Sequence, residues 1–233
     1  MSTRIFLIRH GATVLTAEDR FAGATDVELS DEGREQARRL GERLRTEKVA
    51  AVYASPLGRT VETASLIAQP HGLEVQRRDG LREISHGHWE QMTRREVDEK
   101  YPEEAAAWEE DPYTFAPAGG ESGLAVTARS LPVLLEIVRA HPGETAIIVS
   151  HKATIRLLLS SLLGFDPRRY HDNLDQSPAA LNIVDFKGAA HARLTLFNST
   201  SHYSTSETSV PSVPQARLSK WWDELANAPA REG

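Results

Sequence analysis

The sequence predicts an α/β fold with three layers, in which helices cover both faces of a mostly parallel, mixed sheet. Short apolar runs at Ile5–Ile8, Val49–Ala54 and Ala146–Val149 have the length and composition of buried strands. Each run is followed by a polar turn and then by a segment with helical periodicity. This repeated order of strand, turn and helix is typical of a parallel sheet with crossover helices.

The first half of the chain contains two of these units. A polar loop, Ala12–Leu29, ends at Ser30-Asp31-Glu32, where a capping serine and two acids predict the start of a helix. Residues 36–48 continue this helix with one apolar face. After the second strand, the turn Ser55–Thr60 leads into another amphipathic helical segment, Val61–Ala68.

The middle of the chain predicts a third strand, a long helix, and another strand and helix pair. Leu73–Val75 is a short strand candidate, and Glu121–Ala140 has the pattern of a long helix in which Pro132 could produce a kink. The apolar run at Ala146–Val149 is followed by a helical segment, Ala153–Leu163, that ends at Gly164.

The last predicted strands are Ala180–Phe186 and Ala192–Phe197, which alternate in polarity and could form an edge hairpin around Lys187-Gly188. Beyond Asn198 the composition changes. Residues 199–215 are rich in Ser, Thr and Pro, and a short amphipathic helix is expected around Trp221, Trp222 and Leu225. We therefore expect one domain over residues 1–198 and a flexible C-terminal segment over residues 199–233.

Composition limits the classes of function. The 233 residues are 40% hydrophobic and 26% charged, as in ordinary globular proteins. No apolar run approaches the roughly 18 residues of a membrane span, and Met1 leads directly into a strand, so we expect a cytoplasmic protein without membrane partners. The absence of cysteine excludes a disulfide framework and thiolate catalysis. A net charge of -6 argues against nucleic-acid binding but permits an anionic substrate, because a few arginines in a cleft set the local potential.

Chemically relevant side chains follow several predicted strands, at the edge where open α/β sheets bind ligands. They are Arg9, His10, Arg59, Glu83 and His151. Arginine matches phosphate oxygens with a planar fork, and histidine can be a neutral nucleophile, so this set suits phosphoryl chemistry. Each has a structural alternative. Arg59 could pair with Glu62 on its own helix, Glu83 could be a surface acid, and His151 could be a helix-terminal residue.

Six motifs occur in a consistent order over about residues 4–198. They are Leu7-Ile8-Arg9-His10-Gly11, Phe21-Ala22-Gly23 with Asp26 and Leu29, Ser55-Pro56-Leu57-Gly58-Arg59-Thr60 with Thr63-Ala64, Leu81-Arg82-Glu83 with Gly87 and Trp89-Glu90, Gly120-Glu121-Ser122, and Val149-Ser150-His151. This set closely resembles the histidine phosphatase superfamily, which contains the cofactor-dependent phosphoglycerate mutases and many small phosphatases. The resemblance implies a phosphoglycerate mutase-like fold.

The resemblance also implies roles for the strand-end residues. His10 would accept the phosphoryl group, Arg9, Arg59 and His151 would bind the phosphate, and Glu83 would donate a proton to the leaving oxygen. Two arginines and a cationic histidine would stabilise the transferring phosphate and keep the His10 ring neutral. Because the arginines supply the positive charge, no metal or other cofactor is expected.

Further contacts to the substrate are expected from the residues around these motifs. Gly23 belongs to a motif of the family, and Thr16 stands where the mutases commonly have a phosphate-binding asparagine. Lys152 replaces a small residue beside the second histidine and could bind an anionic group or face solvent. Thr13 and Asn182 could approach the substrate or have structural roles.

His86 and His88 are spaced like metal ligands. They lack a matched carboxylate and a third histidine, which favours a structural role.

The segment from Met92 to Ala128 distinguishes hydrolysis from mutase chemistry. Its cations are Arg94-Arg95 and Lys100, followed by an acidic stretch, and it resembles the phosphatase branch of the family. We therefore predict a phosphatase that hydrolyses a small phosphorylated metabolite. Phosphoglycerate mutase-type transfer and a non-catalytic phosphate-binding module are the alternatives. A homodimer could form through the Trp221-Trp222 region or a strand near Leu194.

Overall fold

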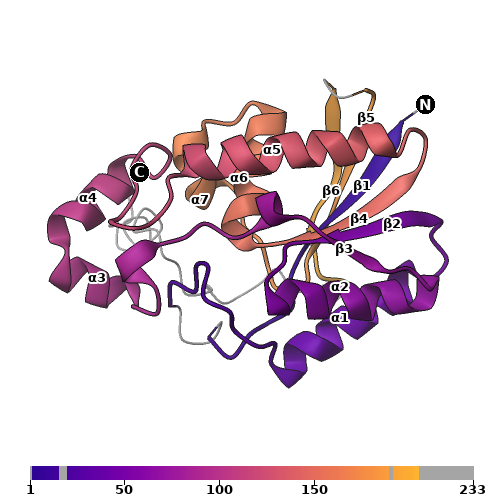
Figure 1. The fold of residues 1–233 in the computed structure, drawn as a ribbon, viewed down its shortest axis with the longest axis horizontal. Coiled ribbons are helices and arrows are strands. Elements are labelled where there is room, and N and C mark those ends of the chain that lie inside the picture. The colour runs from indigo at the N-terminus through magenta and orange to yellow at the C-terminus, as the bar shows by residue number, and fades with distance from the viewer. Residues whose placement is uncertain (1, 16–19, 189–190, 205–233) are drawn as a thin grey trace, which may run out of the picture.

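Six strands form one mixed sheet in the computed structural model, which describes residues 2–15, 20–188 and 191–204. The strands are β1 (Thr3–Arg9), β2 (Val49–Ala54), β3 (Val75–Arg77), β4 (Thr145–Ser150), β5 (Leu181–Phe186) and β6 (Ala192–Ser199). Their order across the sheet is β3-β2-β4-β1-β5-β6 (Figure 1). The first four are mutually parallel, whereas β5 runs antiparallel to both of its neighbours. The predicted mostly parallel, mixed sheet is confirmed.

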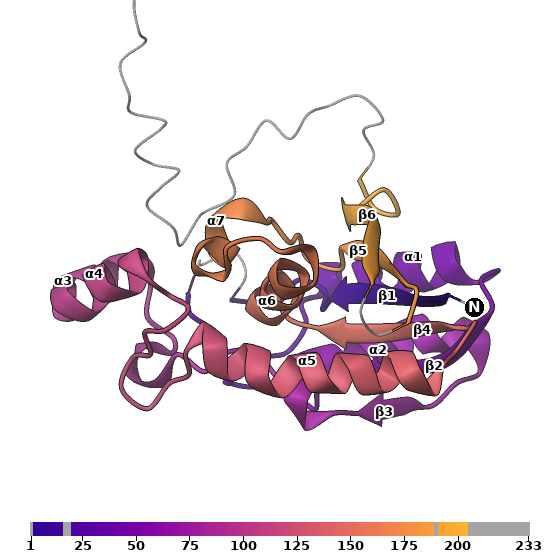
Figure 2. The same ribbon diagram turned by 90° about the horizontal axis from the view of Figure 1, so that it is seen from above.

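Helices cover both faces of this sheet, as Figure 2 shows from above. The helices are α1 (Asp31–Leu44), α2 (Gly58–Ala68), α3 (Arg94–Lys100), α4 (Pro102–Glu110), α5 (Gly123–Ala140), α6 (Lys152–Leu163) and α7 (Tyr170–Asn173). Helices α1 and α2 lie on one face, and α5 and α6 lie on the other. The predicted three-layer α/β architecture is therefore the observed one.

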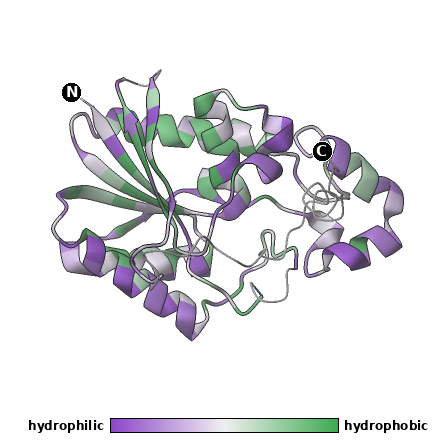
Figure 3. Cartoon of the chain, turned by 180° about the vertical axis from the view of Figure 1, so that it is seen from behind, coloured by the Kyte–Doolittle hydropathy of each residue, from purple (hydrophilic) through white to green (hydrophobic). Residues whose placement is uncertain are grey.

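The core of each face follows from the two-residue period of the strands. In β1, Ile5 and Leu7 pack in the cluster that contains α5 and α6, whereas Phe6 and Ile8 pack in the cluster with α1 and α2. All four side chains are buried. Hydrophobic residues accordingly gather along the central strands in Figure 3. A strand that is buried on both faces reads as a continuous apolar run, which is why β1 is recognisable in the sequence.

Local signals set several helix ends. The hydroxyl of Ser30 accepts a hydrogen bond from the amide of Gly33 at 3.1 Å, as expected for the capping residue of α1. Gly164 ends α6 in the left-handed conformation at φ 74°. Helix α5 continues through Pro132 to Ala140.

Two parts of the prediction differ from the structure. The third strand begins at Val75, which pairs with Val52, two residues later than predicted, and Leu73 packs against the core before the strand starts. Helices α3 and α4 were not predicted, because Val97 is the only buried residue of α3 and α4 buries only Ala105 and Trp108. Figures 1 and 2 place these two helices beyond the end of the sheet where β1 terminates.

The C-terminal prediction lies largely outside the described residues. Strand β6 extends to Ser199, and the structure describes the chain only as far as Ser204. The Ser/Thr/Pro-rich segment beyond that residue and the predicted helix around Trp221 and Trp222 are therefore not described. Among the described helices, none is both long and apolar enough to cross a lipid bilayer.

Candidate active site

The ends of three adjacent parallel strands bring the two histidines and Ser55 together. Arg9 pairs with Ser150 in the register of β1 and β4, so His10 and His151 follow neighbouring strand ends. Their rings lie 5.3 Å apart between centroids. Nε2 of His151 lies 2.8 Å from the hydroxyl of Ser55, which follows β2. The carboxyl edge of the sheet therefore holds the predicted site.

His10 is buried with only 6% of its surface exposed, and its Nδ1 lies 2.8 Å from the carbonyl oxygen of Gly11. A carbonyl oxygen only accepts, so this contact requires a proton on Nδ1 and leaves the lone pair on Nε2. Burial, followed by the charges of Arg59 and Arg9, holds the pKa of His10 well below its usual value. The ring is therefore a neutral imidazole with Nε2 available as a nucleophile.

Arg9 and Arg59 place two guanidinium groups beside this ring. Arg59 is 2% exposed and donates to the carbonyls of Gly23 and Thr25, at 2.8 and 2.7 Å. Arg9 donates to the carbonyl of Gln176 at 2.6 Å, and burial together with neighbouring positive charge lowers its pKa to about 10. Within the described part of the chain, neither arginine forms an ion pair with a carboxylate. Buried cations that contact only carbonyls fit an anion-binding site.

The alternative pairing of Arg59 with Glu62 does not occur. Glu62 instead accepts a hydrogen bond from Nε of Arg34 at 2.7 Å, across to α1. Arg59 is held in place from the other side, because its carbonyl accepts from the hydroxyl of Thr63, which in turn accepts from the amide of Gly11. These contacts fix the start of α2 against the turn after His10.

His151 is fully buried, and its surroundings disfavour a proton on the ring. Burial, followed by the charges of Arg59, His10 and Arg9, lowers the pKa of His151 well below its usual value. The cationic ring expected from the sequence was that of the complex with phosphate. A phosphate dianion bound next to it would act in the opposite direction, because an opposite charge favours the protonated ring.

Glu83 reaches the same edge from the segment that follows β3. Its carboxylate accepts hydrogen bonds from the amides of Ala153 and Thr154, both at 3.1 Å. These amides belong to the first turn of α6, where unpaired N–H groups attract an anion. The amide of Ala153, two residues after His151 in the chain, thus holds the carboxylate of Glu83. Glu83 is not the solvated surface acid of the alternative interpretation.

The loop at residues 21–25 is fastened by a second carboxylate, that of Glu90. It accepts from the amide of Ala24 at 2.9 Å and from the hydroxyl of Thr25 at 2.5 Å. Gly23 adopts φ 49°, and a side chain there would overlap this carboxylate. Since the carbonyls of Gly23 and Thr25 accept from Arg59, Glu90 helps to determine how Arg59 is oriented.

Comparison with known families agrees with this geometry. The family model described as the histidine phosphatase superfamily, branch 1, matches residues 5–200. This chain belongs to that superfamily. The match covers the strands and helices described above except for the first two residues of β1.

Several named phosphatases are similar to this histidine phosphatase. Phosphoserine phosphatase 1 of Hydrogenobacter thermophilus is 37% identical over 167 residues, which are 72% of this chain and 79% of the relative. Glucosyl-3-phosphoglycerate phosphatase of Mycolicibacterium vanbaalenii is 36% identical over 168 residues, covering 69% and 74%.

Solved structures of similar proteins show the same fold. A mycobacterial glucosyl-3-phosphoglycerate phosphatase superimposes with a TM-score of 0.77 at 29% identity, covering 85% of this chain and 100% of the other. A phosphoserine phosphatase variant from Entamoeba histolytica, solved with phosphoserine, gives a TM-score of 0.74 at 28% identity and covers 87% and 100%.

The remaining candidates of this histidine phosphatase are placed less centrally. Thr16 lies outside the described residues. Lys152 is the first residue of α6, next to His151, and is partly exposed. Asn182 is buried and bonded to the carbonyl of Leu7 and the side chain of Gln176, so it has a structural role.

Two other sequence candidates also have structural surroundings. Thr13 is buried in a bridge with Leu29. The ring of His86 packs on Phe21 at 4.7 Å, whereas His88 pairs with Glu104. Across the described residues, no three His, Asp or Glu side chains are grouped to hold a metal ion.

Sequence reasoning gave no role to several residues that contact the site. Ser55, Glu90 and Glu121 stand inside the quoted motifs, and their presence there was the available signal. Arg129 lies outside any motif, and nothing in the pattern of α5 distinguishes it from the exposed arginines of other helices.

Proposed function

We propose that this histidine phosphatase hydrolyses small phosphomonoesters through a phosphohistidine at Nε2 of His10. The observation that supports this most directly is the neutral, buried ring of His10, whose Nδ1 proton is held by Gly11. Two arginines without carboxylate partners in the described residues lie beside it. The relatives named as phosphoserine and glucosyl-3-phosphoglycerate phosphatases support a small phosphorylated substrate.

The first chemical step transfers the phosphoryl group to the enzyme. Nε2 of His10 attacks phosphorus, the bond from phosphorus to the ester oxygen breaks, and Glu83 gives its proton to the departing alcohol. Arg9, Arg59 and His151 stabilise the charge that spreads over the phosphoryl oxygens. Binding of the dianion near Glu83 favours the protonated carboxyl that this step requires.

The second step hydrolyses the intermediate. The carboxylate of Glu83 takes a proton from water, whose oxygen attacks phosphorus while the bond to Nε2 of His10 breaks. Inorganic phosphate leaves, His10 is again neutral, and Glu83 again carries its proton. No metal ion takes part in this scheme, because the guanidinium groups supply the positive charge.

The insert formed by α3 and α4 favours hydrolysis over mutase chemistry. A mutase needs extra cations that hold a carboxylate-bearing substrate while water is excluded. Arg94 instead pairs with Asp98 and Glu109, at 3.0 and 2.9 Å, and Arg95 pairs with Glu99. Both arginines of the insert are thus engaged by its own acids.

We extend the proposal to the rest of the molecule. Residues 1–198 would form the catalytic unit and act in the cytoplasm on a small metabolite, without nucleic acid or membrane partners. The lack of cysteine is compatible with a reducing compartment. Strand β6, which contains Leu194, is the edge strand where a second copy could pair.

The test is the His10→Ala variant assayed with p-nitrophenyl phosphate and phosphoserine. We expect a loss of at least about 10³-fold in kcat/KM, because the covalent route disappears. Arg38→Ala, an exposed change on α1, is the matched control and should leave kcat/KM unchanged. If His10→Ala kept most of the hydrolysis, the mechanism would be wrong. Adding 3-phosphoglycerate during turnover tests the mutase alternative, which predicts phosphoryl transfer to the added acceptor in place of release as phosphate.

A further inference from the structure

The segment that delivers Glu83 to the site has no sheet neighbour in the described structure, yet its carbonyls have partners. Residues 80–83 lie after β3, and their four consecutive carbonyl oxygens all accept from side chains. The carbonyl of Leu81 accepts from the hydroxyl of Ser150 at 2.9 Å, and that of Arg82 accepts from the hydroxyl of Thr154 at 2.7 Å. Buried carbonyls need such partners. The other donors to the carbonyls of this segment come from one residue of α5.

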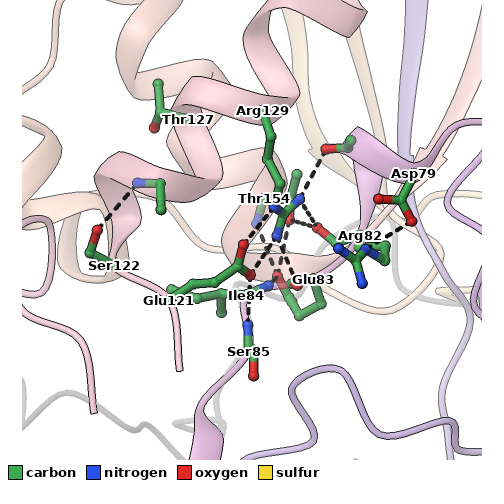
Figure 4. Close-up of polar contacts among 12 residues, drawn as sticks. Asp79, Arg82, Glu83, Ile84, Ser85, Glu121, Ser122, Thr127, Arg129 and Thr154 are labelled. Atoms are coloured by element: carbon green, nitrogen blue, oxygen red, sulfur yellow. Dashed lines mark hydrogen bonds and ion pairs between the residues drawn. The ribbon is translucent and has the colours of Figure 1, made fainter. Parts of the chain in front are cut away.

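That residue is Arg129, which uses every N–H of its guanidinium group. Nη1 donates to the carbonyls of Gly80 and Arg82, at 2.9 and 2.8 Å, and Nη2 donates to the carbonyl of Glu83 at 3.0 Å. Figure 4 shows its fork lying between this segment and Glu121. Nε and the second proton of Nη2 donate to the two oxygens of Glu121, at 2.8 and 2.9 Å. All five donors of the side chain are satisfied.

Glu121 completes the clamp on the other side of Glu83. One of its oxygens also accepts from the amide of Ser85 at 3.0 Å, while the carbonyl of Ser85 accepts from the amide of Glu121 at 2.8 Å. Burial acts to raise the pKa of Glu121, but hydrogen bonds and charge from Arg129 lower it overall, so the acid is ionised. The pair is well shielded, with side-chain exposures of 18% for Arg129 and 26% for Glu121.

The backbone on both sides of Glu83 is therefore fixed by contacts additional to those of its carboxylate. The carboxylate contacts the first turn of α6. The main chain contacts Arg129 of α5 and Glu121 of the turn that precedes α5. We infer that Arg129, oriented by Glu121, is a positioning residue that aligns Glu83 for proton transfer to the leaving group. This inference rests on the proposed function of Glu83 as the acid.

The difference between alkyl and aryl leaving groups supplies a measurement that a purely structural role of Arg129 would not change. An alkoxide is a poor leaving group and needs the proton of Glu83, whereas p-nitrophenolate is a stable anion that leaves without one. Glu83 also acts in the later hydrolysis of the phosphohistidine, which is the same for every substrate, so the useful quantity is kcat/KM, which reports only on the steps up to the departure of the alcohol. A displaced Glu83 should thus lower kcat/KM for an alkyl phosphate and largely spare that for an aryl phosphate. Loss of folded protein or of phosphate binding would lower both values equally.

The experiment compares kcat/KM for glycerol 2-phosphate and p-nitrophenyl phosphate in Arg129→Gln and Arg129→Lys. We expect kcat/KM to fall at least about tenfold for the alkyl ester and less than about threefold for the aryl ester. Lysine should not rescue the alkyl rate, because its three donors on a compact ammonium cannot replace a five-donor fork. Glu121→Gln leaves the carbonyl contacts of Arg129 possible, so it should lower the activity on the alkyl ester selectively but by a smaller factor. This variant serves as the test if the Arg129 variants do not fold.

Two reference variants separate the possible failures. Arg139→Gln lies on the same helix at an exposed position and should behave as the wild type. Glu83→Gln should show the largest selectivity for the aryl ester. If Glu83→Gln lowered kcat/KM equally for both esters, the proposed acid would be wrong. If Glu83→Gln discriminated but the Arg129 and Glu121 variants slowed both esters equally, or if Arg129→Lys matched the wild type, the positioning inference would be overturned while the proposed function stood.

Discussion

At the scale of single residues, the chemistry depends on keeping His10 neutral inside a group of cations. Burial is the largest cause of its lowered pKa, and the charges of Arg59 and Arg9 follow. The same arginines that are proposed to bind the phosphate therefore also keep the proposed nucleophile unprotonated before the substrate binds. In the proposed mechanism, substrate binding and nucleophile activation are thus two consequences of one arrangement of charge.

This coupling predicts a measurable shift in Arg59→Met. Removing the guanidinium should raise the pKa of His10, because a like charge no longer opposes protonation of the ring. The pKa is measured by NMR titration of the ring carbon signals in ¹³C-histidine-labelled protein. The His10 signal is identified as the one absent from His10→Gln.

Arg59→Lys provides the matched comparison, because it keeps a positive charge at the same position. Its His10 signal should titrate closer to that of the wild type than the Arg59→Met signal does. Equal titration midpoints in wild type and Arg59→Met would show that the charge of Arg59 does not influence the ionisation of His10.

At the scale of elements, the loop at residues 21–25 transmits its conformation to Arg59 through Glu90. The Glu90 carboxylate also accepts from the hydroxyl of Ser85 and the amide of His86, at 3.2 and 3.3 Å, so it ties this loop to the segment after Glu83. Burial acts to raise the pKa of Glu90, but these hydrogen bonds lower it overall. An ionised carboxylate is the only acceptor type that serves all of these donors at once.

Glu90→Ala should therefore weaken phosphate binding without touching the phosphate site directly. We expect the inhibition constant for inorganic phosphate to rise about tenfold, which corresponds to about 1.4 kcal/mol of binding free energy. The melting temperature should also fall, because the Ala24 amide and the Thr25 hydroxyl lose their acceptor. Glu103→Ala, an exposed acid on α4, is the control. An unchanged inhibition constant in a folded Glu90→Ala protein would disconnect this loop from the function of Arg59.

Elements with a repeating pattern were predictable from the sequence, and those defined by long-range contacts were not. β1 and β4 are continuous apolar runs, so the rule for parallel strand ends places His10 and His151 at one edge of the sheet, but only the structure shows that their strands are neighbours. Helix α4 buries only Ala105 and Trp108, which join a small cluster with Trp89 beyond the sheet. Two buried residues do not make a repeating apolar face that the sequence would reveal. Arg129 contacts carbonyls 46 to 49 residues away in sequence, and no local pattern encodes that.

The ionisation of His151 before phosphate binds could not be predicted for a related reason. The sequence shows which charges a phosphate would bring, but not how completely a side chain is buried. In the structure His151 has no exposed surface, and desolvation is the largest cause of its lowered pKa. Ionisation states in such a site become predictable only once burial is known.

At the scale of the whole molecule, buried neutral histidines make stability depend on pH. His10, His86 and His151 are all buried, and burial is the first cause of the lowered pKa of each, which reaches about 4 for His86. In the unfolded chain a histidine binds a proton near pH 6.5. Below that pH the unfolded state takes up more protons than the folded state, so the free energy of unfolding must decrease as the pH falls.

His86 allows this contribution to be measured apart from the catalytic residues. Between about pH 6.5 and pH 4, one such histidine lowers the free energy of unfolding by up to about 1.4 kcal/mol per pH unit. His86→Phe keeps an aromatic ring against Phe21 and removes the titrating group, so urea unfolding should show a shallower loss of stability on acidification. His191→Gln, at an exposed position, should keep the wild-type slope. The window between about pH 7 and pH 5 is decisive, since carboxylates with a lowered pKa, such as Glu90 and Glu121, reduce stability only as the pH approaches their unfolded values near 4.3. An identical slope in His86→Phe and the wild type over that window would show that His86 does not remain neutral in the folded protein.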